Sequence, residues 1–144
     1  MSTILIIDDD ESTRIALQAL LRRKNLNVLL AADGYAGLRL VGAGIFDAAI
    51  IDMFMPGMDG IATIRELIKV DPRLPFIAVS GESFTNGKIG GPDFLGMAVR
   101  LGATAALQKP FSTTDLLAAL DQCFAKRRPD AIAGLAVGIR NVIG

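Results

Sequence analysis

Short apolar runs alternate along the chain with longer segments in which apolar residues recur every three or four positions. The short runs occupy residues 3–7, 27–31, 48–51, 76–79 and 105–107. Because these runs are continuously apolar, they predict strands that are buried on both faces, as in a parallel sheet.

Five longer segments have the spacing of amphipathic helices. Residues 60–70 show it most clearly, since Ile61, Ile64 and Leu67 repeat at helical intervals. The last of these segments follows Ser112, a residue type that often caps a helix N-terminus. The remaining predicted helices cover residues 11–24, 94–101 and 35–41, the last of which is expected to end at Gly42 and Gly44.

The strand–helix alternation occurs five times and predicts one parallel sheet with helices on both faces. In such a sheet, ligands bind beyond the carboxyl ends of the strands. The polar residues at or just after those ends are Asp8, Asp9, Asp52, Ser80 and Lys109. We therefore expect these side chains to form one pocket.

The composition favours one folded domain. The chain has 144 residues, of which 51% are hydrophobic, enough for a sizeable core. Lys and Arg together number 15, as do Asp and Glu, so the formal net charge is zero. This balance offers no basic field for nucleic acid, and direct DNA binding is not expected. No apolar stretch approaches the roughly 18 residues of a membrane span, so no membrane partner is expected.

Histidine is absent and cysteine occurs once, at Cys123. The absence of histidine excludes histidine catalysis, histidine metal ligands and phosphohistidine formation on this chain. A lone cysteine cannot form an internal disulfide, which suits a reducing cytoplasm, and we interpret Cys123 as a small apolar helix residue. The N-terminus lacks the basic region and apolar core of a secretory signal, so a cytoplasmic location is predicted.

Three carboxylates, those of Asp8, Asp9 and Asp52, would meet in the expected pocket. Without compensation they would repel one another and raise one another's pKa. A hard divalent cation relieves that repulsion, and oxygen ligands without His or Cys point to Mg2+ or Mn2+ rather than zinc. An alternative for residues 8–11 is an acidic loop that caps the next helix, and both interpretations stay open.

Two further segments belong to the same pocket. Asp52 is followed by the sequence Met-Phe-Met-Pro-Gly-Met-Asp-Gly at 53–60, whose proline and glycines predict a tight turn leading into a helix. Such a turn presents backbone groups beside the carboxylate. Lys109 begins a Lys-Pro-Phe sequence, and its positive charge would balance the negative charge of the acids around a phosphoryl group. A cis peptide before Pro110 would direct the Lys109 side chain into the pocket. Ser80 offers a hydroxyl for a phosphoryl oxygen.

These motifs together resemble the receiver domain of bacterial response regulators, of which the stand-alone chemotaxis regulator is the simplest member. They are the aspartate pair, the D-x-x-M-P-x-M-D-G sequence from Asp52, the serine at the fourth strand end, and K-P-F. The resemblance covers about residues 2–126 and leaves 127–144 as an apolar C-terminal extension. It implies an α/β, flavodoxin-like (βα)5 fold with a doubly wound parallel sheet of five strands in the order 2-1-3-4-5.

The resemblance also implies a role for each acid. Asp52 would be the phosphoacceptor, taking a phosphoryl group from a phosphohistidine on a sensor histidine kinase or a histidine phosphotransfer protein. The reaction would depend on Mg2+. Asp9, Asp52 and the Phe54 backbone carbonyl would bind the metal directly, and Asp8 would hold it through water.

Lys109 would contact the acceptor carboxylate and then the phosphoryl group, while Ser80 would move to bond that group. The switch would change contacts with an unknown downstream protein target, or between two copies through residues 94–125 or the C-terminal extension. Self-phosphotransfer and autodephosphorylation would be the only catalysis.

Three features depart from the family pattern. Ala106 occupies the position where many receivers carry an aromatic switch residue, whose rotamer changes when the active-site hydroxyl moves. We therefore expect this coupling between hydroxyl and aromatic ring to be absent or replaced, with Phe84 as one candidate substitute. The segment 81–93 is longer than in compact members and is either a flexible flap or an ordinary surface insertion. Its Lys88 would either reach the phosphoryl group or remain solvated.

The third departure is the segment 129–144, where Ile132, Leu135, Ile139 and Val142 recur at helical spacing. It would dock on the receiver or on a second subunit. A frayed terminus and the start of a longer protein are the alternatives.

Two other functions are compatible with parts of the sequence. Residues 8–12 contain D-x-D-x-S, similar to the nucleophile loop of haloacid-dehalogenase-like phosphatases, with Asp8 as nucleophile. Against this, the later acidic pair is missing, since Asp115 and Asp121 fall on a predicted helix. The second alternative is a receiver-fold binding module that acts without phosphorylation, and the complete set of pocket residues argues against it.

Overall fold

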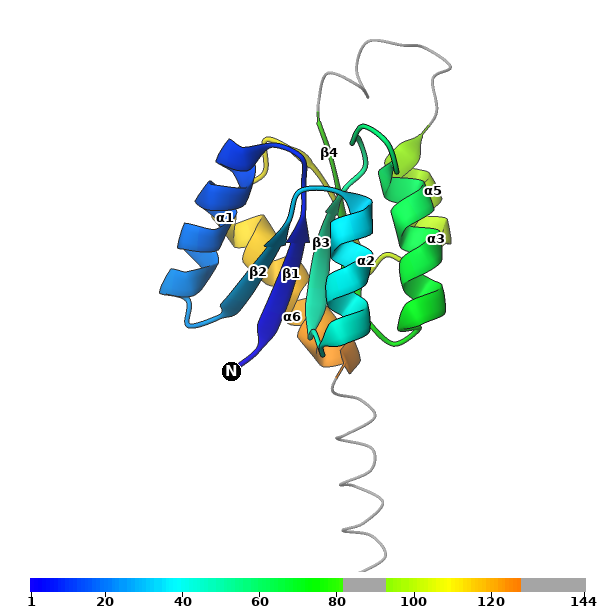
Figure 1. Ribbon diagram of the computed structural model, residues 1–144. Coiled ribbons are helices and arrows are strands. Elements are labelled where there is room, and N and C mark those ends of the chain that lie inside the picture. Colours follow the sequence, from blue (N-terminus) through cyan, green and yellow to red (C-terminus); the bar gives the residue numbers. More distant parts are fainter. Residues whose placement is uncertain (82–92, 128–144) are drawn as a thin grey trace, which may run out of the picture.

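The computed structural model describes residues 1–81 and 93–127, and in them five strands form one parallel sheet in the order β2-β1-β3-β4-β5 (Figure 1). The strands are β1 (Thr3–Ile7), β2 (Asn27–Ala31), β3 (Ala48–Asp52), β4 (Phe76–Gly81) and β5 (Ala105–Lys109). The helices of the described residues are α1 (Glu11–Arg23), α2 (Gly34–Ala43), α3 (Gly60–Val70), α5 (Phe94–Arg100) and α6 (Thr113–Arg127). The predicted fold class and strand order are confirmed.

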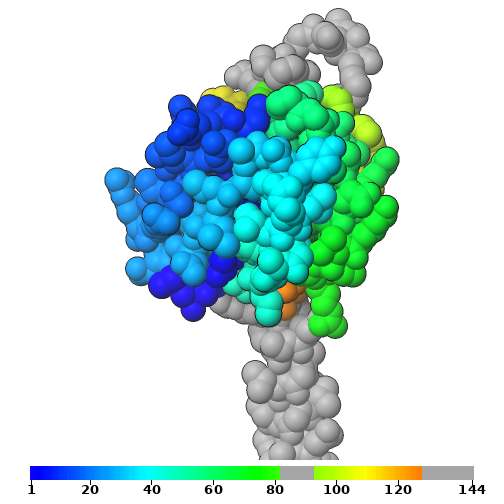
Figure 2. All heavy atoms as spheres, in the orientation of Figure 1, coloured from blue at the N-terminus to red at the C-terminus, as the bar shows by residue number. Residues whose placement is uncertain are grey.

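Helices cover both faces of the sheet because strand side chains alternate between them. Leu5 and Ile7 of β1 pack on one face in a cluster with residues of α2, α3 and α5. Ile4 and Ile6 pack on the other face with residues of α1 and α6. All four side chains are fully buried, which explains the continuously apolar strand. On the first face, α2 and α3 lie against each other (Figure 2).

Polar side chains begin several of the helices. Asp33, Asp59 and Asp93 cap α2, α3 and α5, each accepting a hydrogen bond from the backbone N–H three residues later. Ser112 caps α6 in the same way, at 3.0 Å, as predicted. Because capping accounts for these three aspartates, the acids at the strand ends become the candidates for chemistry.

The second helix ends later than the sequence predicted. α2 continues through Gly42 to Ala43, and Gly44 is its C-cap. A glycine lowers helix propensity by about 1 kcal/mol relative to alanine, but it does not end a helix by itself. Packing of the buried Gly34 and Val41 on this helix overrides the local preference.

Some predictions fall outside the described residues. They concern Phe84 and Lys88 in the segment 82–92, and the apolar extension within 128–144, and all of them remain predictions. Within residues 1–81 and 93–127, no helix combines the length and the apolar character that a membrane crossing requires.

Cys123 lies in α6 and is fully buried. Burial raises the pKa of its thiol to about 11. At neutral pH the thiol is therefore protonated and acts as a small apolar group, as interpreted from the sequence.

Candidate functional site

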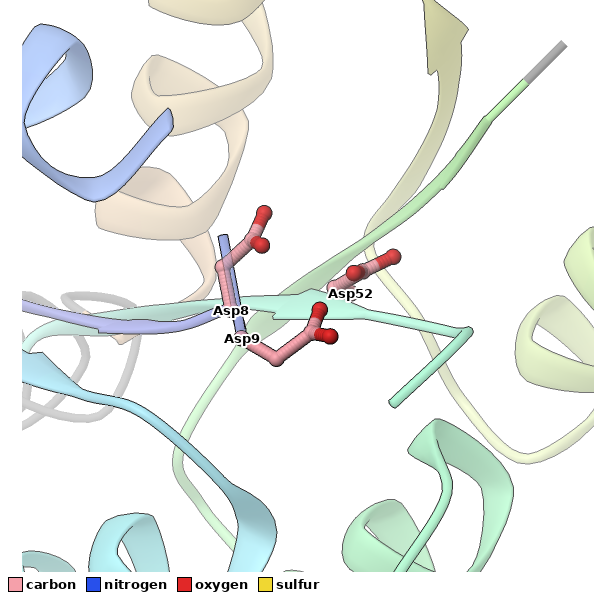
Figure 3. Close-up of side chains that lie close together, drawn as sticks. All are labelled: Asp8, Asp9 and Asp52. Carbon is pink, nitrogen blue, oxygen red and sulfur yellow. The ribbon is translucent and has the colours of Figure 1, made fainter. Parts of the chain in front are cut away.

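The register of the central strands brings three carboxylates together at the carboxyl end of the sheet. Ile7 of β1 pairs with Ile51 of β3, so Asp8, Asp9 and Asp52 follow on adjacent strands. Their side chains reach toward a common space (Figure 3). One carboxylate oxygen of each lies within 4.8 Å of the others. The clustering predicted for these acids is therefore present.

The three acids differ in exposure and in charge balance. Asp8 is 3% exposed and Asp52 is 6% exposed, whereas Asp9 is open to solvent. Burial, followed by the charge of Asp8, raises the pKa of Asp52 to about 6, although Lys109 and the Phe54 N–H act in the opposite direction. A buried carboxylate beside another acid favours protonation or a bound cation.

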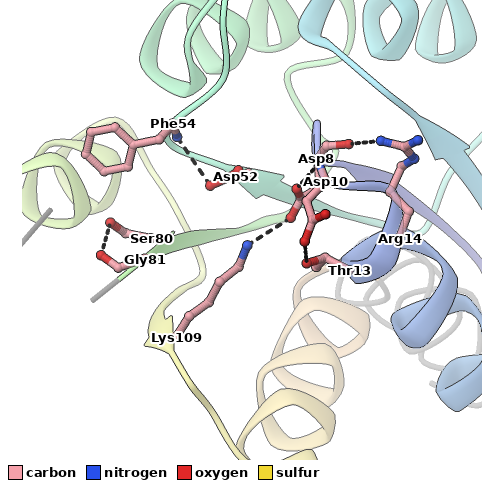
Figure 4. Close-up of polar contacts among 9 residues, drawn as sticks. All are labelled: Asp8, Asp10, Thr13, Arg14, Asp52, Phe54, Ser80, Gly81 and Lys109. Atoms are coloured by element: carbon pink, nitrogen blue, oxygen red, sulfur yellow. Dashed lines mark hydrogen bonds and ion pairs between the residues drawn. The ribbon is translucent and has the colours of Figure 1, made fainter. Parts of the chain in front are cut away.

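Asp8 is held by partners from both ends of the chain. Lys109 Nζ lies 3.0 Å from Asp8 Oδ2, and the Asp10 backbone N–H donates to Asp8 Oδ1 at 2.9 Å (Figure 4). Arg14 donates from Nη1 to the Asp8 carbonyl oxygen at 2.7 Å. The structure thus pairs Lys109 with Asp8, and the predicted contact of Lys109 with Asp52 remains a prediction.

The last strand positions Lys109 at this edge. Gly81 of β4 pairs with Lys109 of β5, and the peptide between Lys109 and Pro110 is cis, as expected. Its ammonium group forms an ion pair with Asp8, one of the three acids of the cluster (Figure 4).

The turn after Asp52 presents backbone groups to it, as the sequence indicated. The Phe54 N–H donates to Asp52 Oδ1 at 3.2 Å. Gly57 has φ of 79°, a left-handed conformation that favours glycine. Gly60 begins α3 and lies against the strand end, where an added Cβ would be 2.5 Å from Met53 Cα and 2.7 Å from the Asp52 carbonyl oxygen.

Gly60→Ala is therefore expected to lower the free energy of unfolding by about 2 kcal/mol, because backbone atoms around Asp52 must shift to admit the methyl group. Urea unfolding with a metal chelator measures the effect. Gly42→Ala is the matched control, since nothing lies within 4 Å of its added Cβ. That change is expected to stabilise α2 by up to about 1 kcal/mol. Equal effects of the two substitutions would contradict the close approach at Gly60.

Ser80 lies near the end of β4 and is fully buried. Its hydroxyl donates to the Gly81 carbonyl oxygen at 3.5 Å, the long limit of a hydrogen bond. A bond this weak leaves the hydroxyl easily redirected toward another acceptor. The structure thus places Ser80 at the same end of the sheet as the acids (Figure 4).

Ala106 is the second residue of β5 and pairs with Ala78 of β4. It is half-buried. An alanine has no side-chain torsion that changes between two positions. The sheet therefore carries a small side chain where many receivers have an aromatic switch residue.

The sequence left the role of the acidic segment 8–11 open and did not indicate the contact made by Arg14. Asp10 is the N-cap residue of α1 and accepts a hydrogen bond from the Thr13 hydroxyl at 2.6 Å, which lowers its pKa. Asp10 thus holds the N-cap position without a side-chain bond to the helix backbone, while Asp8 and Asp9 join the cluster. Arg14 was not predicted, although a basic residue in the first turn of a helix after an acidic loop was a usable signal.

The donor atoms of the cluster suit a hard divalent cation. Asp8, Asp9 and Asp52 supply carboxylate oxygens within one small space. Mg2+ prefers such oxygen ligands. Burial and then the charge of Asp8 raise the pKa of Asp52, and a bound cation would offset both effects. The residues therefore fit the predicted ion.

Fold and site together define a class: a doubly wound α/β domain with a largely buried acidic cluster beyond its central strands. The chain belongs to the response regulator receiver domain family, which matches residues 4–121. It is thus a receiver domain of two-component response regulators, which are signalling proteins. Receiver domains bind Mg2+ at an acidic pocket, and response regulators interact with histidine kinases.

Similar proteins agree with this assignment. Response regulator MprA of Mycolicibacterium vanbaalenii is 31% identical over 131 residues, which make up 91% of this chain and 54% of that protein. A response regulator receiver domain protein from Clostridium thermocellum aligns with a TM-score of 0.79 and 28% identity, covering 89% of this chain and 98% of that one. A response regulator from Burkholderia pseudomallei, solved with a phosphorylated aspartic acid, calcium and citrate, aligns with a TM-score of 0.71 and 27% identity over 83% of this chain and 66% of that one.

The chain spans about half the length of the first curated relatives. The predicted stand-alone arrangement therefore remains a prediction. The phosphatase alternative finds no support, since the receiver family accounts for the region that contains its proposed nucleophile loop.

Proposed function

We propose that Asp52 is the phosphoacceptor of a two-component phosphorelay. A largely buried carboxylate lies there beside two other acids and close to a lysine, at the carboxyl end of the sheet. An Asp52 oxygen attacks the phosphorus of a phosphohistidine on a sensor histidine kinase or a histidine phosphotransfer protein. The P–N bond breaks, its electron pair and a proton remain with the imidazole, and an acyl phosphate forms.

The acidic cluster supports a Mg2+ site with Mn2+ as a substitute. Asp9 and Asp52 would bind the ion directly with the Phe54 backbone carbonyl, and Asp8 would bind it through water. The ion supplies charge neutralisation for the transferred phosphoryl group. Asp8 suits an indirect role because its two oxygens already accept hydrogen bonds from Lys109 and the Asp10 N–H.

Lys109 and Ser80 are proposed to respond to the phosphoryl group. The Lys109 ammonium is within reach of the cluster through its ion pair with Asp8, and it would exchange part of that contact for a phosphoryl oxygen. Ser80 would replace its long bond to Gly81 with a stronger bond to the same group. Both changes would favour a different conformation at the ends of β4 and β5 after phosphorylation.

The receiver comprises residues 2–126 in this proposal, with 127–144 as an apolar extension. The signal passes to a downstream protein target, or to a second copy through residues 94–125 or the extension, without direct DNA or membrane binding. The chain performs only self-phosphotransfer and autodephosphorylation.

Incubation with acetyl phosphate tests the proposal without a partner kinase. We expect an intact-mass gain of one phosphoryl group in the presence of Mg2+, lost with a chelator and mapped to Asp52 after proteolysis. Labelling that maps to Asp8 would instead support the phosphatase-type nucleophile. Labelling that is unaffected by the chelator would refute the metal dependence.

A further inference from the structure

An aromatic pair joins the turn after Asp52 to α5. The rings of Phe54 and Phe94 have centroids 4.8 Å apart and an interplanar angle of 79°, an edge-to-face contact. Phe54 is two residues beyond Asp52 and donates its backbone N–H to that carboxylate at 3.2 Å. Phe94 is the first residue of α5. One residue thus contacts the candidate acceptor with its backbone and a distant helix with its ring.

The surroundings of the pair leave room for movement. A cleft of about 330 Å³ lies beside the rings, between the turn and the start of α5. A ring in a close-packed core is held by its neighbours, whereas a ring that borders free volume has space for a second position. The residues that line the cleft are Met53, Phe54, Met55, Pro56, Asp59 and Phe94.

Beneath α5, the sheet offers small residues. Ala78 and Ala106 are paired across β4 and β5, and Ala98 of α5 is fully buried. Alanines have no rotamers, so the contact of α5 with these strands contains no side chain at those positions that can alternate between two states. The aromatic pair is a contact with torsional freedom between α5 and the turn after Asp52.

We infer that Phe94 is a positioning residue for Asp52, acting through Phe54, and that the same ring pair reports the state of Asp52 to α5. The inference rests on the proposed acceptor role of Asp52. A phosphoryl group or cation on Asp52 alters the hydrogen bond from the Phe54 backbone and so shifts the Phe54 ring against Phe94. Coupling is reciprocal, so loss of the Phe94 ring also loosens the Phe54 N–H at the acceptor.

The test compares Phe94→Leu, which keeps apolar volume but removes the ring, with Phe94→Tyr, which keeps it. Met97→Leu is the matched control, because Met97 is a partly buried residue of the same helix that packs on the same cluster. Each protein is phosphorylated with acetyl phosphate and Mg2+. The rate of labelling at Asp52 is measured first. Amide hydrogen exchange of residues 94–100 is then measured with and without beryllofluoride, a phosphoryl mimic.

In the wild type, beryllofluoride is expected to change the exchange of the α5 amides. In Phe94→Leu we expect that response to disappear while Asp52 is still labelled, at a rate lowered about two- to ten-fold, the range for loss of one aromatic pair. Phe94→Tyr and Met97→Leu should behave like the wild type. The double variant Phe54→Leu with Phe94→Leu should be no slower than either single variant, because the two act as a unit.

Three outcomes would overturn the inference. An unchanged α5 response in Phe94→Leu shows that the ring pair carries no signal. An equal loss in Met97→Leu shows a general effect of helix packing. Additive effects of the two phenylalanine substitutions show independent roles. Failure of the wild type to take label at Asp52 is a distinct result, which removes the proposed function and this inference with it.

Discussion

Asp52→Asn is expected to abolish phosphoryl transfer from acetyl phosphate, with a loss of at least about 10³-fold, as for removal of other catalytic nucleophiles. Asparagine retains the shape of aspartate and can still accept the Phe54 N–H at the same place. It lacks the anionic oxygen that attacks phosphorus and removes one charge from the cation site. Intact-mass kinetics over a range of phosphodonor concentrations measure the loss.

Asp59→Asn is the matched control for that substitution. It makes the same chemical change in the same turn, and asparagine caps helices about as well as aspartate, so α3 should remain capped. Labelling close to the wild-type rate is expected. Undiminished labelling of Asp52→Asn would place the acceptor elsewhere, and peptide mapping would then distinguish Asp8 from Asp9.

The strand ends were predictable from the sequence because their position depends on local properties. Apolar runs define the strands, and a parallel sheet gathers their carboxyl ends on one edge. The sequence alone therefore predicts that Asp52, Lys109 and Ser80 lie together. The order of the strands followed from the family resemblance.

The difference in burial and pairing between Asp8 and Asp9 was not predictable in the same way. The two residues are consecutive and chemically identical, yet Asp8 is buried and paired with Lys109 while Asp9 is open to solvent. That difference depends on a contact across 101 positions of the sequence. The pairing of Phe54 with Phe94 is likewise a tertiary contact, and no periodicity in the sequence indicates it.

The raised pKa of Asp52 leads to a second large prediction, on stability. In metal-free solution the free energy of unfolding of the wild type, relative to Asp52→Asn, is expected to fall by about 2 kcal/mol between pH 4 and pH 8. Folding raises the pKa of Asp52 from 3.8 to about 6. Between those values the native state binds more protons than the unfolded state, so stability decreases as pH rises and levels off above the folded pKa.

Urea unfolding of both proteins with a chelator, at several pH values, measures this difference. Other carboxyl groups titrate in both proteins, so subtraction isolates the contribution of Asp52. Addition of Mg2+ at pH 8 should stabilise the wild type more than Asp52→Asn, because a cation that binds only the folded, ionised cluster stabilises it by mass action. A difference curve that is flat from pH 4 to 8 would show that burial and the charge of Asp8 do not raise the pKa of Asp52. Equal stabilisation of both proteins by Mg2+ would show that the ion binds without Asp52.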